Sequence, residues 1–219
     1  MENSQNIKGN SNKVKLDFDY IAKDLKSEFY KIADYLLNNV VIKVNENRFR
    51  ITELEIYYND SENHDDPFVH KNSLQLENAK WYFHGSGLDI TFGKEKIYAS
   101  ALIRGVKNIK SNIYTDGPLN VVTELFKSMK SVYEQSTFIL SPYSFEKEEW
   151  EPVKSTRIGL NKDKDNEGDY IKKLYRYLVE INTNHKFKEK TIVAKKLQDR
   201  NDFSHNEIKK IFNRKSVNK

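Results

Sequence analysis

The chain has 219 residues, a formal net charge of +5 and no cysteine. This length suits one domain with a full hydrophobic core, and the lack of cysteine excludes disulfides and thiolate metal sites. No stretch approaches the ~20 apolar residues of a membrane span, and the first residues lack the apolar segment of a signal peptide. The sequence therefore predicts a cytoplasmic protein with no membrane partner.

Positive charge is concentrated at the end of the chain. Residues 185–219 hold eleven Lys and Arg against four Asp and Glu, a surplus of seven, so the rest of the chain is close to neutral. Such a basic segment is typical of an appendage that contacts phosphate groups. A solvated, lysine-rich helical end explains the same charge equally well. Residues 1–15 are rich in Asn, Ser and Lys and are predicted to be disordered.

The first half of the chain changes from helical to strand periodicity. Apolar residues recur every three or four positions over residues 16–37, which predicts one or two helices. Residues 40–44 and 49–58 are β-branched and aromatic and are predicted to form a hairpin. The polar segment 59–80 is predicted to be a long loop, and long loops inside compact domains often carry function.

The second half is predicted to continue the sheet and then to end in helices. Residues 81–92 and 97–106 are expected to be strands, and Gly117-Pro118 to begin a helix that continues to Lys130. Residues 157–160 resemble a short strand. Residues 136–151 have no clear pattern, and residues 170–182 fit either a strand or a helix. Two short helices are predicted from Thr191 onward, and Ser204 is the expected N-cap of the second.

This order of elements predicts an α+β fold. We expect a single domain over residues 16–184 with a curved, mostly antiparallel sheet flanked by helices. A basic helical extension would follow over residues 185–219.

The segment from Glu53 to Tyr57 is the first candidate for chemistry. Alternate residues of a strand share a face, so Leu54 and Ile56 would face the core while Glu53, Glu55 and Tyr57 lie opposite. Two neighbouring carboxylates repel each other, and burial raises the pKa of a carboxylate, so one of them could act as a base near neutral pH. An exposed strand face with solubilising glutamates fits this spacing as well.

A buried charge is predicted at Arg104, inside the apolar run 99–106. A buried guanidinium requires a partner, and a carboxylate of the Glu53–Glu55 strand is the candidate. The resulting pair could be a structural salt bridge or a substrate clamp. His64 and His70 lie near two Asp residues, but their spacing does not match a known metal-ligand pattern, so no metal site is predicted.

Several segments, in order, resemble the methylpurine (alkyladenine) DNA glycosylases. The resemblance covers roughly residues 29–180. It rests on a helix, turn and Glu-bearing strand at KIADYLLNNVVIKVNENRFRITELEIYY, and on these later motifs: DPFVH at 66–70, ALIRGV at 101–106, the Gly-Pro at 117–118, RIG at 157–159 and LYRY at 174–177.

The resemblance implies site residues and a reaction. Such enzymes flip a nucleotide out of the helix and cleave its N-glycosidic bond with a water activated by a glutamate. By position, Glu55 falls on the catalytic glutamate, Tyr57 and His70 on residues that contact the flipped base, and Arg104 beside the attacking water. Asp89 takes the place of a stacking tyrosine.

The resemblance also implies a DNA partner, with the choice between single and double strands left open. Phe92 falls near the family's intercalating tyrosine. Phosphate contacts are expected from four lysines of the extension, which are Lys195, Lys196, Lys209 and Lys210.

The leading hypothesis is thus a monomeric DNA glycosylase for base excision and DNA repair, with no metal or cofactor. Glu53 and Asp89 would be polar walls of its substrate pocket. Two alternatives remain at this point: a nucleic-acid-binding module on the same fold without catalysis, and a hydrolase of free nucleosides or nucleotides. Exchange of Glu55 for Gln should abolish hydrolysis and leave binding nearly intact in an enzyme, and should change little in a pure binding module.

Overall fold

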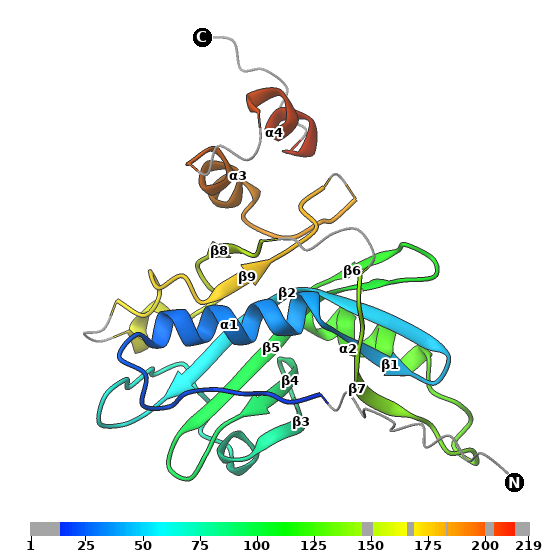
Figure 1. Cartoon of the computed structure of the whole chain (residues 1–219), viewed down its shortest axis with the longest axis horizontal. Helices are drawn as coiled ribbons and strands as arrows, with labels where there is room; N and C mark the ends of the chain where they lie inside the picture. Colours follow the sequence, from blue (N-terminus) through cyan, green and yellow to red (C-terminus); the bar gives the residue numbers. More distant parts are fainter. Residues whose placement is uncertain (1–13, 146–150, 166–168, 183, 200–203, 213–219) are drawn as a thin grey trace, which may run out of the picture.

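The computed structural model describes residues 14–145, 151–165, 169–182, 184–199 and 204–212. Its centre is a nine-stranded sheet in which every described pairing is antiparallel and the main strand order is β3-β4-β5-β2-β1-β7. The sheet curves, with helices on its flanks (Figure 1). The predicted α+β class is therefore confirmed.

The first helix is shorter than the periodicity predicts. Helix α1 spans Leu25–Asn38, and the side chain of Asp24 caps it by accepting the Lys26 N–H. The preceding segment, residues 14–23, contains no helix and lies extended along the body of the protein (Figure 1). Leu16 in this segment is buried in the core, so the apolar residues at its start pack as an extended strap rather than as a helix. Residues 1–13 of the predicted disordered tail lie outside the described residues.

The predicted hairpin is confirmed as β1 (Val40–Val44) and β2 (Asn47–Asn59). The long loop after β2 contains a short 3-10 helix, η1 (Ser73–Leu76). The predicted strand 81–92 is in fact two strands, β3 (Asn78–His84) and β4 (Gly87–Phe92). Gly87 directly follows the turn at residues 85–86 and has a φ of 150°, and a side chain there would clash with Pro118 and Leu102.

The remaining strands close the sheet around β2. Strand β5 (Tyr98–Asn108) pairs with β2 and β4, and the short β6 (Tyr114–Asp116) pairs with β5. Helix α2 (Pro118–Lys127) follows and ends three residues earlier than predicted. Strand β7 (Phe138–Pro142), in the segment without a clear pattern, pairs with β1.

The end of the sheet differs from the sequence prediction. Residues 157–160 are not a strand. The strand is β8 (Val153–Ser155), and Gly159 has a φ of 74° that suits a turn. A second 3-10 helix, η2, spans Lys162–Lys164. In the ambiguous segment 170–182 the structure forms β9 (Arg176–Leu178), which pairs with both β8 and β2.

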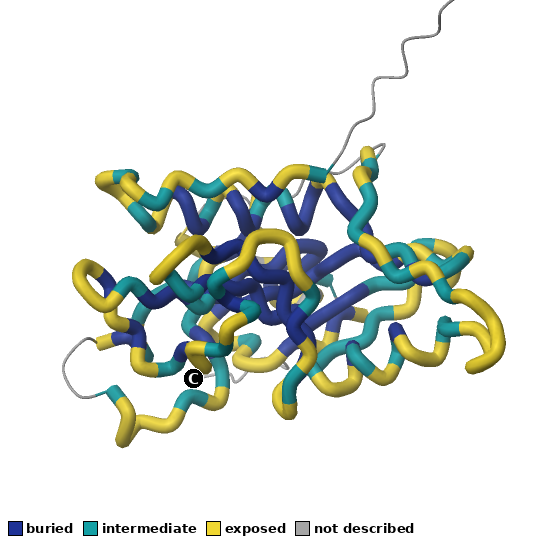
Figure 2. Tube along the Cα trace, turned by 90° about the horizontal axis from the view of Figure 1, so that it is seen from below, coloured by how far each residue is buried: buried dark blue, intermediate teal, exposed yellow. Residues whose placement is uncertain are grey.

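Two hydrophobic clusters support this architecture. The larger lies between α1 and the sheet, where one face of the helix and most of the central strands are buried (Figure 2). The second joins β8 and β9 to helices α3 (Lys190–Asp199) and α4 (His205–Phe212), the two helices predicted at the end of the chain. The described part of the basic extension, residues 185–199 and 204–212, is therefore packed onto the edge of the domain. Among the described residues, every helix is too short or too polar to cross a bilayer.

Candidate active site

The predicted alternation along β2 is confirmed. Leu54, Ile56 and Tyr58 belong to the main hydrophobic core. Glu53 and Glu55 lie on the other face and are also buried, with 2% and 0% of their surface exposed. Because both faces of β2 are covered, these carboxylates are not solubilising surface groups. Their charge must be balanced by groups within the protein.

Glu55 accepts hydrogen bonds from three groups. Tyr57 Oη donates to Oε2 at 2.9 Å, and the backbone N–H of Ile158 donates to Oε1 at 2.8 Å. The Arg104 guanidinium lies beside both oxygens, with Nε 3.3 Å from Oε1 and Nη1 3.4 Å from Oε2. The partner that the sequence predicts for Arg104 is therefore found on β2.

The pKa of Glu55 is raised above that of an ordinary glutamate. Burial is the main cause, and the neighbouring negative charge of Glu53 adds to it. Arg104, the Ile158 N–H and Tyr57 act in the opposite direction without cancelling the effect of burial. A carboxylate in this condition takes up a proton more readily than one in water, which is what a general base requires.

Glu53 is held by two arginines. Its Oε1 atom lies 2.9 Å from Arg104 Nε and 2.8 Å from Arg176 Nε. Arg176 comes from β9 and is fully buried. Two glutamates and two arginines thus form a compact buried network in which the opposite charges balance. Arg176 lies within one of the motifs of the resemblance, yet its contact with Glu53 had no local sequence signal.

A cavity of about 310 Å³ opens in front of this network. Tyr57, Arg104 and Ile158, the three partners of Glu55, all line it, whereas Glu55 itself lies directly behind them. Phe68 and His70 from the long loop contribute two more rings. The cavity therefore combines stacking surfaces with a polar end that leads to Glu55.

A second polar group lines another part of the cavity. Asp89 on β4 accepts hydrogen bonds from Ser100 Oγ at 2.6 Å and from the His84 ring, whose Nε2 is 2.9 Å away. The His70 and His84 rings meet edge to face with centroids 4.8 Å apart. Burial and the nearby His84 lower the pKa of His70, which favours a neutral ring there. If a turn had been predicted at Gly85-Ser86, His84 and Asp89 would have been expected on the same face of the sheet, because this turn joins the paired strands β3 and β4.

The long loop is fixed by a buried ion pair. Arg157 binds Asp66 through two hydrogen bonds, of 2.7 Å from Nη1 and 3.1 Å from Nη2, and neither side chain is exposed. The Arg157 guanidinium also lies 4.7 Å from the centre of the Tyr57 ring. Because Arg157 immediately precedes Ile158, this pair holds the N–H that binds Glu55.

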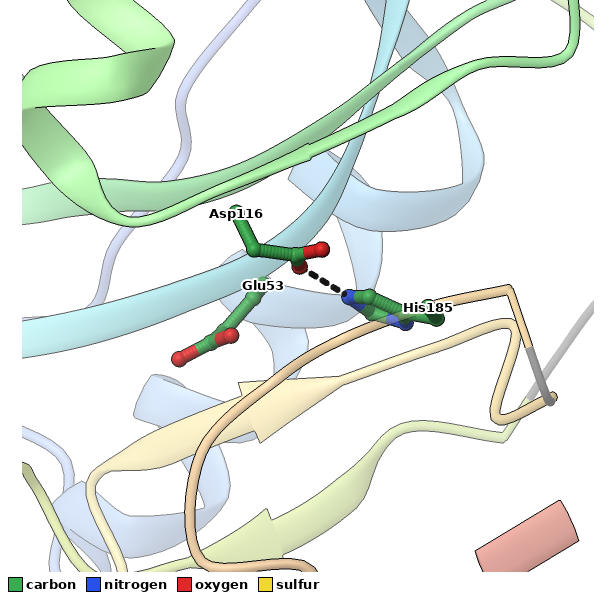
Figure 3. Close-up of side chains that lie close together, drawn as sticks. All are labelled: Glu53, Asp116 and His185. Carbon is green, nitrogen blue, oxygen red and sulfur yellow. Dashed lines mark ion pairs between the residues drawn. The ribbon is translucent and has the colours of Figure 1, made fainter.

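Three groups with metal-ligating atoms lie together beside Glu53. The ligand atoms of Glu53, Asp116 and His185 are within 4.8 Å of one another (Figure 3). However, Glu53 is already in contact with two guanidinium groups, which would repel a cation bound there. His185 is fully buried, its Nε2 lies 3.0 Å from Asp116 Oδ1, and its ring stacks on Tyr114.

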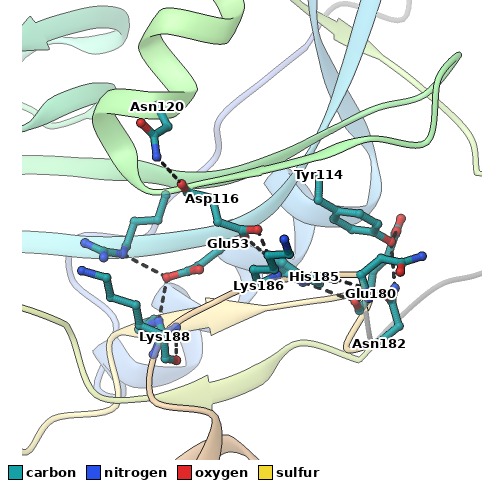
Figure 4. A network of polar contacts seen from close by, with 12 residues as sticks. Glu53, Tyr114, Asp116, Asn120, Glu180, Asn182, His185, Lys186 and Lys188 are labelled. Carbon is teal, nitrogen blue, oxygen red and sulfur yellow. Dashed lines mark hydrogen bonds and ion pairs between the residues drawn. The ribbon is translucent and has the colours of Figure 1, made fainter. Parts of the chain in front are cut away.

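Asp116 and His185 connect the sheet to the extension. Asp116 ends β6, and its Oδ2 also accepts the Lys186 N–H at 3.0 Å. Figure 4 shows these contacts running from the β5–β6 hairpin to the segment that leads into α3. We therefore assign the cluster to the attachment of the extension rather than to a metal ion.

The structure brings together most of the predicted site residues. Tyr57, His70, Asp89 and Arg104 line one cavity, with Glu53 and Glu55 behind it. Residues outside this cavity include the lysines of the extension, Lys195, Lys196, Lys209 and Lys210, which lie on α3 and α4.

The prediction for Phe92 is wrong. Phe92 has 0% of its surface exposed and packs with Phe18 in the core, their ring centroids 5.1 Å apart. A ring in this position does not reach a DNA duplex. The residue alternates with Asp89 and Thr91 on β4, so it points to the opposite face from the cavity.

Comparison with known proteins finds a partial match to a viral protein. No protein-family model matches the chain. Over 129 residues the chain is 33% identical to the uncharacterized protein L759 of Acanthamoeba polyphaga mimivirus. The match covers 48% of this chain and 59% of the viral protein, so it spans less than two thirds of that relative.

Proposed function

We propose that the protein hydrolyses the N-glycosidic bond of a nucleotide whose base enters the cavity, with Glu55 as the general base. The observation that carries this proposal is the position of Glu55. It is a buried carboxylate with a raised pKa, held by Tyr57, Arg104 and the Ile158 N–H at the polar end of a cavity of about 310 Å³. Ligand sites in proteins begin at about this volume.

In the proposed reaction Glu55 takes a proton from a water molecule as the water oxygen bonds to the sugar carbon. The bond from that carbon to the base nitrogen breaks, and its electron pair leaves with the base, which takes a proton from solvent. The contact from Arg104 Nη1 to Glu55, at 3.4 Å, is near the outer limit of a hydrogen bond, so a water can replace it with little loss.

The charge of the site supports the same reaction. A sugar that loses its base develops positive charge, and a nearby negative carboxylate stabilises that charge. Arg104 alone would oppose it, but the direct pairing of Arg104 with Glu53 offsets its positive charge. Tyr57, Phe68 and His70 would hold the base by stacking. The DNA partner and the cytoplasmic location both stay predictions from the sequence.

One observation favours the alternative of a binding module without catalysis. Glu55 has no exposed surface, and both of its oxygens already accept hydrogen bonds. A carboxylate held in this way could serve only to fix Arg104 and the Ile158 loop at the cavity wall. In that case the cavity would bind a base without cleaving it.

Release of free base from a DNA panel tests the proposal. The panel contains alkylated, deaminated, hypermodified and normal bases, in single and double strands, and it is incubated with wild type, Glu55→Gln and the surface control Glu95→Gln. We expect release by wild type and Glu95→Gln, and a loss of at least about a hundredfold for Glu55→Gln with binding retained. Full activity of Glu55→Gln would refute the role of Glu55. Binding without release by any of the three proteins would support the binding module.

A further inference from the structure

We propose that the cavity selects a base that carries an exocyclic amino group, and that Asp89 accepts a hydrogen bond from that group. This selectivity rests on the function proposed above, because a base must enter the cavity, and it adds the class of base that enters. It follows from three features of Asp89: its place in the sheet, the direction of its hydrogen bonds and its separation from the cations of the cavity.

Asp89 lies in the same row of the sheet as Glu55. Leu102 on β5 is paired with Glu55 on one neighbouring strand, β2, and with Asp89 on the other, β4. Residues paired in this way point to the same face, and neighbouring strands lie about 4.8 Å apart, so the backbones of Glu55 and Asp89 are about 10 Å apart. Leu102 lies between them and lines the cavity. The cavity thus lies over a row that has a carboxylate at each end.

The two ends of this row would meet different parts of a nucleotide. In the proposed reaction Glu55 activates the water that attacks the sugar carbon, so the sugar lies toward β2. A base bonded to that carbon extends away from Glu55, over Leu102 and toward β4. Asp89 is therefore placed to meet an edge of the base rather than a sugar hydroxyl.

The hydrogen bonds of Asp89 indicate that both of its oxygens act as acceptors. Gln75 Nε2 donates to Ser100 Oγ at 2.9 Å, so the Ser100 hydroxyl donates its own hydrogen to Asp89 Oδ2, at 2.6 Å. The Ser86 N–H donates to His84 Nδ1 at 3.2 Å. The hydrogen of a neutral His84 ring is then on Nε2, which lies 2.9 Å from Asp89 Oδ1. A carboxyl group that only accepts is in its ionised form.

This arrangement leaves a negative charge on the cavity wall. A neutral His84 ring does not balance the charge of Asp89. Arg104 and Lys164 line the same cavity, but in the part of the chain that the structure describes neither is within ion-pair distance of Asp89. An ionised carboxylate has about four acceptor sites, of which Ser100 and His84 occupy two. Because Asp89 is only 3% exposed, a ligand with an N–H group at this position would lower the cost of burying its charge.

An exocyclic amino group is the part of a base that meets this requirement. Adenine, cytosine and guanine each present such a donor at an edge of the ring. A carbonyl oxygen in the same place would set its lone pairs against those of the carboxylate. A hydrogen bond to a charged group changes affinity by about tenfold to a hundredfold. The cavity should therefore distinguish a base with the amino group from one that has hydrogen in its place.

Binding of paired deoxynucleosides to the full chain, measured by isothermal titration calorimetry, tests this selectivity. The pairs are deoxyguanosine with deoxyinosine, deoxyadenosine with the deoxyriboside of purine, and deoxycytidine with the deoxyriboside of pyrimidin-2-one. The two members of each pair differ only by the amino group, and all are 2′-fluorinated so that they resist cleavage. Each is measured free and at the centre of a short DNA strand. Wild type should bind the amino member of at least one pair about tenfold to a hundredfold more tightly, and that pair identifies the base.

Two variants assign the preference to Asp89. Asp89→Ala should remove the difference within the responding pair, and Asp89→Asn should reduce it by about threefold or more, because a neutral amide oxygen accepts a weaker hydrogen bond. The control Asp169→Asn, at an exposed position, should keep the difference. A variant that only loosened the cavity would weaken both members of a pair equally, so the ratio of the two affinities separates recognition from structural damage.

The selectivity is refuted if wild type binds no probe, or binds the two members of every pair alike. It is also refuted if the Asp89 variants weaken both members equally. Base release from the unmodified pairs separates this result from the proposed hydrolysis. An amino preference in binding without release would refute the hydrolysis and leave the selectivity intact. Equal release from both members of every pair would refute the selectivity and leave the hydrolysis intact.

Discussion

Tyr57 donates a 2.9 Å hydrogen bond to Glu55, two residues earlier on the same strand. Both side chains lie on the face of β2 that is opposite the main core, and Tyr57 alone of the two reaches the cavity. The ring is thus the contact between the cavity and the buried carboxylate. Through this hydrogen bond, the ionisation of Glu55 depends on the group that occupies the cavity.

Exchange of Tyr57 for Phe should shift the pH dependence of base release. The hydroxyl hydrogen bond favours the ionised form of Glu55, so its removal should raise the pKa of Glu55 further. The acid limb of the pH–rate profile should then move to higher pH, while the ring remains in place for stacking. A profile from pH 4 to pH 9 for wild type and variant checks this. An unchanged acid limb would mean that the ionisation of Glu55 does not control the rate.

Exchange of Glu55 for Gln should remove the part of the folding stability that varies with the ionisation of Glu55. The raised pKa means that the folded state binds a proton at Glu55 more tightly than the unfolded chain does. Wild type therefore loses stability as the pH rises from the ordinary value of 4.5 through the raised pKa, and Gln does not titrate. Each unit by which the pKa is raised contributes about 1.4 kcal/mol to the difference at high pH.

Urea denaturation of both proteins over the same pH range measures this effect. The unfolding free energy of Glu55→Gln relative to wild type should be constant near pH 4, rise as the pH increases through the window above 4.5 and then become constant again. Glu95→Gln, at an exposed position, serves as the control and should follow wild type throughout. A difference that does not vary with pH would contradict the raised pKa.

Exchange of Asp66 for Asn should be strongly destabilising. It would leave Arg157 buried without a counter-charge, and breaking such a pair costs about 3–5 kcal/mol. The exposed pair Asp169–Lys172 provides the control, because Asp169→Asn removes a carboxylate that solvent already screens. Thermal unfolding should show a much lower melting temperature for Asp66→Asn alone. Equal melting temperatures would indicate that Arg157 finds another partner.

The sequence predicts some of these contacts for simple physical reasons. The two-residue period of a strand places Glu53, Glu55 and Tyr57 on one face, and a charge inside the apolar run of β5 requires a carboxylate on the neighbouring strand. The contacts of Arg157 and Arg176 have no such local signal. Their partners are about 91 and 123 residues away in the chain, so only the folded sheet brings them together.

Two errors in the predicted elements have local causes. The apolar spacing before α1 imitates a helix, but Asp24 caps the helix only at Leu25, and the earlier residues pack as an extended strap. Residues 157–160 alternate like a strand, yet the positive φ of Gly159 and the buried side chain of Arg157 fix a turn there. In both places tertiary packing outweighs local periodicity.

Exchange of Asp89 for Asn should weaken substrate binding and leave the chemical step largely intact. Asp89 is 3% exposed and accepts hydrogen bonds from Ser100 and His84, so it fixes the His84 ring at the cavity wall, and none of its contacts in the described part of the chain is with Glu55. Loss of the charge should loosen His84 and, through their edge-to-face contact, His70. If these rings bind the base in the ground state and in the transition state alike, KM rises about tenfold and kcat stays within about twofold.

Steady-state base release measures both constants, with Glu55→Gln as the reference for a loss of kcat. A fall in kcat with KM unchanged would instead place Asp89 in the chemical step.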